Sequence, residues 1–152
     1  VDMNRKITEN DLYFICCIIE GVARKQTCRN KDVVNQLGRE ALQHLLRYAH
    51  IYHCDPIEET IDMIIKEYHI MKGIFYIQNV KHRSKDRLPD IMYMGELYKR
   101  LILDTKSAEE EYADGIIRVY NDPICDKIDD YDCSAFYEPS YEIKRAYYNH
   151  GF

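Results

Sequence analysis

The run Leu12-Tyr13-Phe14-Ile15-Cys16-Cys17-Ile18-Ile19 decides the fold of this 152-residue chain. Its apolar side chains recur at helical spacing in two stripes, so the helix that it forms is apolar on almost every side. Such a helix is typical of the centre of a helical bundle. The run has eight residues, far fewer than the ~20 that a membrane-spanning helix needs. Thr8, followed by Asp11 three residues later, predicts that this helix starts with a capping box.

The rest of the chain carries start and stop signals for further amphipathic helices. Asn30 is expected to cap a short helix that Gly38 ends, with another helix following at once. Asp55-Pro56 predicts a new helix with Asp55 as its N-cap. Four more starts are marked by Asp90, by a capping box at Ser107-Ala108-Glu109-Glu110, by Asp122-Pro123 and by Pro139-Ser140. The sequence therefore predicts an all-α fold, a helical bundle of seven or eight helices in two packed halves.

The two halves differ in composition and flank a crossover. Residues 3–72 are expected to form an N-terminal helical half, and residues 88–152 an acidic, Tyr-rich C-terminal half. Residues 73–80 carry strand-favouring side chains without an evident partner strand, so an extended crossover and a short helix both stay open. Residues 81–87 hold four basic side chains and one acidic one, which is typical of a linker. We take residues 73–87 as the crossover and basic linker, and we expect the halves to share one core.

Charge is distributed unevenly along the chain. Residues 1–80 have 10 basic and 11 acidic side chains, whereas residues 88–152 have 7 and 14, which gives net charges of −1 and −7. An acidic half is unsuited to holding a nucleic-acid backbone. It suits docking on a basic protein, and tyrosines are enriched at such interfaces. The predicted partner-binding residues are Asp126, Asp129, Asp130, Asp132, Tyr131, Tyr137 and Tyr141. Closure of the core by these tyrosines is the alternative.

The chain offers few candidates for catalysis or metal binding. His50, His53 and Cys54 have the ligand types that zinc accepts, but their spacing fits no established site and a polar turn explains them as well. There is no Gly-x-Ser-x-Gly motif and no Gly-rich phosphate loop. The six cysteines include no Cys-x-x-Cys pair, and we expect them to be reduced. We therefore predict a protein that is not an enzyme and has neither cofactor nor metal.

A DNA-binding interpretation rests on the helix, Gly turn and helix between Asn30 and Ala49, which resemble a helix-turn-helix. The second helix of this pair would present its polar side chains to a groove of DNA. The predicted nucleic-acid-binding residues are Arg39, Gln43 and Arg47, with Lys81, Arg83, Lys85 and Arg87 of the basic linker. DNA is thus the alternative partner, which the sequence supports less strongly than a partner protein.

A resemblance to one protein family bears on the function of this chain. It is carried by Phe14-Ile15-Cys16, Glu20, Ala23, Lys25, Val33-Val34, Leu37-Gly38 and Glu58-Glu59-Thr60-Ile61-Asp62-Met63-Ile64-Ile65. Over roughly residues 10–70 the chain resembles a family of small uncharacterised helical bacterial proteins. That family is encoded beside ADP-ribosyltransferase-like genes in toxin–antitoxin-like operons. The resemblance implies a non-enzymatic partner protein and carries over no catalytic residues.

These observations together predict a cytoplasmic, regulatory protein that binds another, basic protein in an antitoxin-like manner. The acidic, Tyr-rich surface would occlude the partner and steer its approach electrostatically. The alternatives are a helix-turn-helix DNA-binding regulator and a phage-type inhibitor that mimics nucleic acid. The sequence leaves the identity of the partner and the oligomeric state open.

Overall fold

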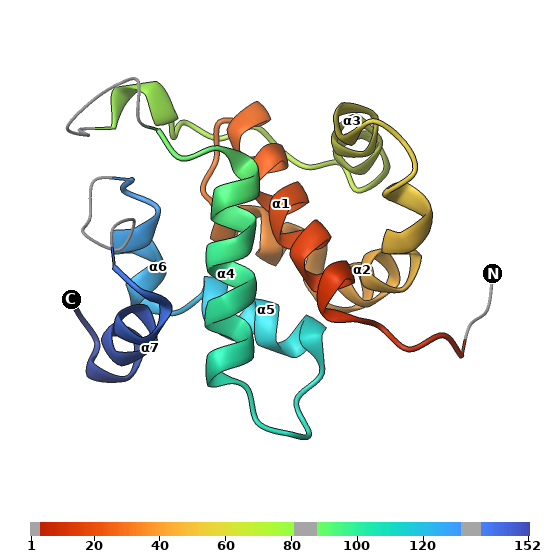
Figure 1. The fold of residues 1–152 in the computed structure, drawn as a ribbon. Helices are drawn as coiled ribbons and strands as arrows, with labels where there is room; N and C mark the ends of the chain where they lie inside the picture. Colours follow the sequence, from red (N-terminus) through yellow and green to blue (C-terminus); the bar gives the residue numbers. More distant parts are fainter. Residues whose placement is uncertain (1–3, 81–87, 132–137) are drawn as a thin grey trace.

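A computed structural model describes residues 4–80, 88–131 and 138–152. The described residues form seven α-helices and one short 3₁₀ helix, with no β-strand among them. The α-helices are α1 (Glu9–Lys25), α2 (Asn30–Tyr52), α3 (Ile57–Glu67), α4 (Ile91–Thr105), α5 (Tyr112–Tyr120), α6 (Pro123–Ile128) and α7 (Ser140–Asn149), and the 3₁₀ helix is η1 (Ile77–Asn79). The all-α packed arrangement predicted from the sequence is confirmed (Figure 1).

Helix α1 lies at the centre of the molecule, as its apolar run predicts (Figure 1). Leu12, Cys16, Ile19 and Val22 are completely buried. The helix packs against α4 on one side and against α2 and α3 on others. One continuous apolar core therefore contains residues of both stretches that flank the linker. Residues 81–87 of that linker lie outside the described residues.

The predicted helix starts are confirmed at several places. Thr8 and Asp11 form the capping box of α1, with each side chain bonded to the backbone N–H of the other residue. Asp90 caps α4 by accepting from the N–H of Tyr93. Asp122 caps α6, which begins at Pro123. Gly38 interrupts α2 with a φ of 78°, a left-handed conformation that favours glycine.

Three predicted helix starts are wrong. The N-cap of α2 is Arg29, and Asn30 is already the first residue of the helix. The N-cap of α3 is Pro56, not Asp55, and its side chain makes no capping hydrogen bond. The segment around Ser107 starts no helix, because Glu110 forms an ion pair with Arg118 instead and α5 begins only at Tyr112. Residues 73–80 contain both features that the sequence left open for the crossover, an extended segment and a short helix. They run extended into η1, held where the N–H groups of Gly73 and Phe75 donate to the carbonyls of Gln26 and Thr27.

No helix in the described part of the chain is both long enough and apolar enough to cross a lipid bilayer. The apolar faces of the helices are used inside the molecule, where the core collects side chains from α1 to α7. Helix α7 closes the fold over α4, and its C-cap His150 adopts a left-handed conformation.

Candidate functional site

The acidic, Tyr-rich residues predicted to bind a partner do not form one surface. Asp129 and Tyr131 are buried, so their assignment to an exposed surface is wrong. Asp126 and Asp130 are exposed, but both face cations of the same chain. Tyr141 lies exposed on α7. Two further members of the predicted set, Asp132 and Tyr137, lie outside the described residues.

The acidic side chains of α5 and α6 instead face a polar edge of α2 and its N-cap. Arg29 lies 4.0 Å from Asp130, and Lys31 lies 3.0 Å from Asp126. Asn35 and Asn121 exchange two side-chain hydrogen bonds of 2.9 and 3.0 Å. Arg39 then bonds Asp114 at 2.8 Å and Glu111 at 3.1 Å. Residues later in α2 pair with residues earlier in the α5–α6 stretch, so the two stretches run antiparallel along this edge. We call this edge the polar seam.

Beneath the polar seam lies a buried cluster of polar side chains. Glu20 of α1 accepts hydrogen bonds from Asn30 (2.8 Å), Arg24 (2.9 Å) and the hydroxyl of Tyr131 (2.5 Å). Asp129, which follows α6, accepts a 2.5 Å bond from the Tyr98 hydroxyl of α4. Because these partners come from α1, α2, α4 and the end of α6, the buried acid cluster joins both stretches of the chain.

Burial sets the protonation of this cluster. Loss of solvent, reinforced by the nearby charge of Glu20, raises the pKa of Asp129 well above its ordinary value. Burial likewise raises the pKa values of Tyr98, Tyr120 and Tyr131. These phenols therefore remain neutral, and those of Tyr98 and Tyr131 donate hydrogen bonds. Because its members are buried and hydrogen-bonded to one another, the cluster stabilises the fold.

The predicted DNA-binding residues are only partly free. Arg39, the first residue of the second helical part of α2, is held by Asp114 and Glu111 in the polar seam. Gln43 and Arg47 are half-buried. The linker residues Lys81, Arg83, Lys85 and Arg87 lie outside the described part of the chain. The helix, Gly turn and helix are present, and DNA binding by them stays a prediction.

The histidines and cysteines do not gather into a metal site among the described residues. His53 stacks on Phe14 with ring centroids 5.3 Å apart, and Cys54 donates to the carbonyl of His50 at 3.6 Å. The described cysteines, Cys16, Cys17, Cys28, Cys54 and Cys125, form no disulfide. Burial raises the pKa values of Cys17 and Cys28 to about 11, which makes both thiols poor nucleophiles.

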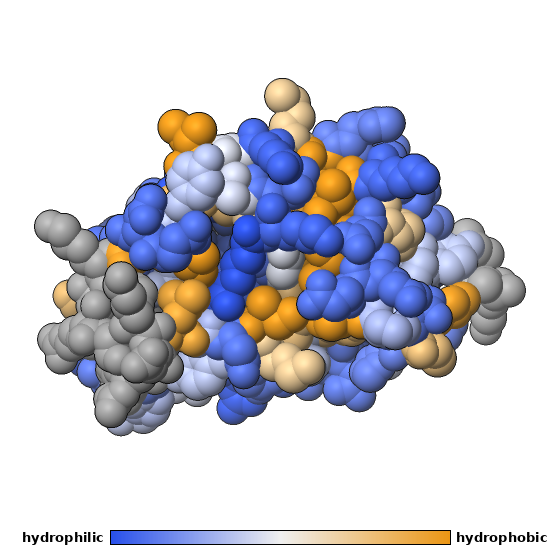
Figure 2. All heavy atoms as spheres, turned by 90° about the horizontal axis from the view of Figure 1, so that it is seen from above, coloured by the Kyte–Doolittle hydropathy of each residue, from blue (hydrophilic) through white to orange (hydrophobic). Residues whose placement is uncertain are grey.

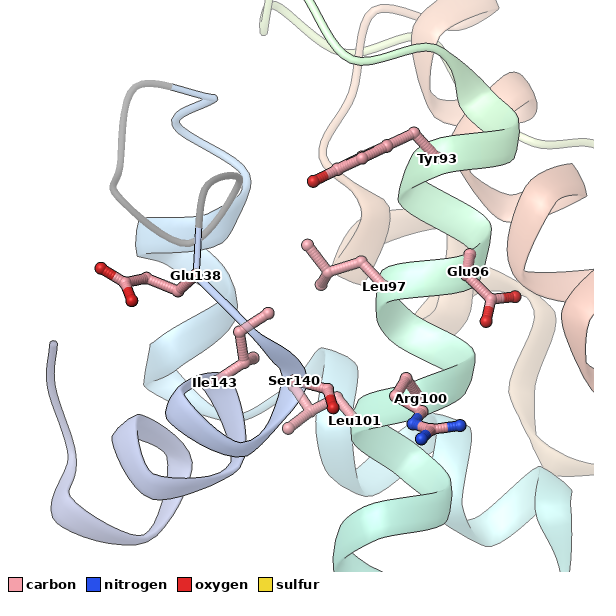
Figure 3. A pocket seen from close by; sticks show the side chains of 8 residues that line it. All are labelled: Tyr93, Glu96, Leu97, Arg100, Leu101, Glu138, Ser140 and Ile143. Carbon is pink, nitrogen blue, oxygen red and sulfur yellow. The ribbon is translucent and has the colours of Figure 1, made fainter.

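A groove lies between α4 and α7. It has a volume of about 270 Å³. Tyr93, Leu97 and Leu101 project from one stripe of α4, and Ile143 of α7 faces them across the opening (Figure 3). The rim of this α4–α7 groove is polar and consists of Glu96, Arg100, Glu138 and Ser140. An apolar floor with a polar rim is found both at protein interfaces and in small-molecule pockets.

Helix α7 is fixed as the second wall of the groove by Arg118 of α5. The Arg118 guanidinium bonds Glu110 at 2.8 Å, Thr105 at 3.0 Å and the Tyr147 hydroxyl at 2.8 Å. The bonds to Glu110 raise the pKa of Arg118 above its already high value, so the cation is permanent. Ile143 and Ala146 of α7 are buried as well. The groove thus has two firmly placed walls.

A second group of exposed apolar side chains lies on the segment between α3 and η1. Met71, Ile74 and Tyr76 are 73%, 91% and 43% exposed. Figure 2 shows the face seen from above in Figure 1, where apolar side chains form separate patches divided by hydrophilic ones. Apolar surface is thus present on this face in separate patches.

The α4–α7 groove and the buried acid cluster were both missed from the sequence alone. The Tyr93, Leu97 and Leu101 stripe of α4 was visible as helical spacing, but nothing in it indicated that the floor stays partly open. Glu20 stands in the middle of an apolar helix, where an acid is rare unless it is paired. The position of Glu20 in the sequence was therefore the one feature from which a buried polar cluster could have been predicted.

No family model matches this chain, and comparisons with curated proteins and with solved structures found no significant match.

Proposed function

We propose that this chain is a non-enzymatic, antitoxin-like or regulatory protein that binds a partner protein in the α4–α7 groove. The observation that carries the proposal is the groove itself, where an apolar floor between two fixed helices is ringed by charged side chains. Tyr93 at its edge is 46% exposed. Tyrosine at such a position supplies a large contact area at a small cost in conformational entropy.

The partner is expected to be basic. Two of the charged rim residues, Glu96 and Glu138, are acids and one, Arg100, is a cation. Arg100 is in turn close to Asp104, 3.8 Å away. The whole chain has a net charge of −5, which attracts a cationic protein over a distance and accelerates association. A segment with an apolar anchor residue flanked by Lys or Arg fits this chemistry.

The proposed binding surface, the α4–α7 groove, differs from the surface that the sequence predicted around Asp126, Asp129 and Asp130. Asp126 and Asp130 are already engaged by Lys31 and Arg29, and Asp129 is buried. An incoming cation would have to displace the chain's own cations at those positions. The rim of the α4–α7 groove needs no such exchange at Glu138, which forms no ion pair with any residue that the structure describes.

The test is affinity purification of the tagged protein from its host, followed by direct binding measurements with the purified partner. Glu138→Lys should weaken binding at low salt several-fold, and Arg100→Gln should strengthen it, because the partner is cationic. Glu59→Lys, an equal charge reversal at an exposed position of α3, is the matched control. A partner whose affinity responds to Glu59→Lys as strongly as to Glu138→Lys would refute the groove.

A further inference from the structure

Helix α7 lies at the edge of the molecule, where it packs against α4 (Figure 1). On its outer side, Tyr141 and Tyr148 are 66% and 55% exposed, and Lys144 and Arg145 are exposed between them. These four positions recur at helical spacing, so they form one stripe along the helix, which we call the α7 stripe. Exposed tyrosines beside cations are typical of surfaces that bind another protein.

The α7 stripe is held in a fixed position. Tyr148 packs edge-on against Tyr147 with ring centroids 5.3 Å apart, and the Tyr147 hydroxyl accepts a 2.8 Å bond from Arg118. Arg145 already forms an ion pair within its own helix. Lys144 forms none with any residue in the described part of the chain. Because the helix is anchored, little conformational entropy is lost when the stripe binds a second surface.

The α4–α7 groove beside the stripe has a complementary chemistry. Its floor is apolar, and its rim includes the acids Glu96 and Glu138 (Figure 3). Its volume of about 270 Å³ is below the roughly 300–1,000 Å³ of sites for whole small molecules, and it suits one inserted aromatic side chain. A tyrosine next to a free cation, which the α7 stripe provides, therefore matches both the floor and the rim.

The charges around Tyr141 are self-complementary. Glu138 stands three residues before Tyr141, and Lys144 stands three residues after it. When two copies of this segment cross antiparallel at Tyr141, the Glu138 of one copy faces the Lys144 of the other. The two-fold axis then repeats the same pair at the other end of the crossing. Opposite charges therefore meet at both ends.

We infer that two copies of this chain associate through the α7 stripe, with Tyr141 of each copy inserted into the α4–α7 groove of the other. The interface is isologous, since each copy contributes the same helix and the same groove. This inference goes beyond the proposed function, because it requires the groove but no other protein. A second copy and a partner protein exclude each other there, so self-association covers the apolar floor when no partner is bound.

The association is expected to be weak and reversible. An interface built on one ten-residue helix belongs to the small class, below ~1,200 Å² of total buried area. Each copy also has a net charge of −5, so the two copies repel each other at a distance. Salt screens this repulsion. Self-association should therefore weaken less with added salt than the binding of a basic partner, which distinguishes the two occupants of the groove.

Sedimentation velocity of the purified full-length chain, without any partner, tests the inference. With rising concentration, the wild-type protein should change reversibly from monomer to dimer. Tyr141→Ala should weaken the dimer about tenfold or more, since each interface contains the change twice. Tyr76→Ala, which removes a 43% exposed tyrosine from the segment before η1, should leave the dimer unchanged. A wild type that stays monomeric at its highest soluble concentration would overturn the inference, as would equal dimerisation of Tyr141→Ala and the wild type.

A charge exchange tests the antiparallel crossing. Glu138→Lys and Lys144→Glu each place like charges together at both ends, so each variant alone should dimerise more weakly than the wild type. A mixture of the two variants should form a heterodimer, because opposite charges meet again at every contact. Lys72→Glu, the same reversal at an exposed position far along the chain, should dimerise as the wild type does. A mixture that associates no more than the separate variants would contradict this interface, whatever the affinity purification shows about a partner.

Discussion

Gly95 determines how closely α1 and α4 approach at the centre of the molecule. A Cβ atom on this residue would lie 2.9 Å from the backbone nitrogen of Cys17 and 2.3 Å from its sulfur. No real Cβ atom comes this close to backbone, so the two helices can pack as they do only because position 95 lacks a side chain. The two helices are packed so closely at this point that there is no room for even one methyl group.

Gly95→Ala is therefore expected to destabilise the protein by about 1–3 kcal/mol, since overpacking forces the backbones apart. Urea unfolding followed by circular dichroism measures this loss. Glu96→Ala, one residue further along α4 and exposed, should change the free energy of unfolding by less than about 0.5 kcal/mol. Equal stability of Gly95→Ala and the wild type would show that α1 and α4 pack less closely.

Glu20 is the second residue on which the fold depends. Its carboxylate accepts from Arg24, Asn30 and Tyr131 while 1% exposed. Glu20→Ala removes the acceptor but leaves the three donors, so it should cost about 3–5 kcal/mol. Chemical denaturation of this variant beside Glu40→Ala, an exposed acid of α2, gives the comparison. A loss below about 1 kcal/mol would mean that the donors find other partners.

At the scale of elements, the capped helices were the most predictable. Thr8, Asp90 and Asp122 act as N-caps because their side-chain oxygens reach backbone N–H groups two or three residues on, a purely local interaction. The capping box at Ser107 failed for a reason outside the segment. Glu110 is drawn to Arg118, eight residues later, and the sequence contains no sign of that competition.

Helix α7 depends on one such long-range contact. Tyr147→Phe removes the hydroxyl that accepts the 2.8 Å bond from Arg118, and it should cost about 1 kcal/mol. The amides of α7 should then exchange faster, while those of α1 keep their protection. Tyr148→Phe, at a 55% exposed position of the same helix, should leave α7 unchanged. Faster exchange spread evenly over the molecule would argue against a specific anchor.

At the scale of the whole molecule, the sequence indicated the charge imbalance but not its purpose. The acids of residues 88–152 were interpreted as a free surface for a basic partner. The structure places Asp114, Asp126 and Asp130 against Arg39, Lys31 and Arg29 of the other stretch. Each of these ion pairs joins residues that lie 75 to about 100 positions apart in the sequence, so it depends on the tertiary fold. The composition of the chain cannot reveal such a pair.

The polar seam is expected to specify how the two stretches align more than how stable they are. Its ion pairs are solvent-exposed, and such pairs contribute little to the free energy of unfolding. Lys31→Asp combined with Asp126→Lys should therefore retain near-native stability, whereas Lys31→Asp alone places two acids together and lowers the melting temperature. Calorimetry at low and high salt checks this, because added salt should reduce the defect of the single variant. If the melting temperature of Lys31→Asp did not change with salt, the polar seam would not be held by electrostatic attraction.

The proposal that the α4–α7 groove binds a basic partner is tested most directly by site-specific photo-crosslinking in the native host. A photoreactive amino acid at position 100, on the rim of the groove, should capture one basic protein. The same amino acid at position 59 of α3 should capture none in comparable yield. Crosslinking of that partner from position 59 and not from position 100 would contradict the account and place the binding surface at the opposite end of the molecule.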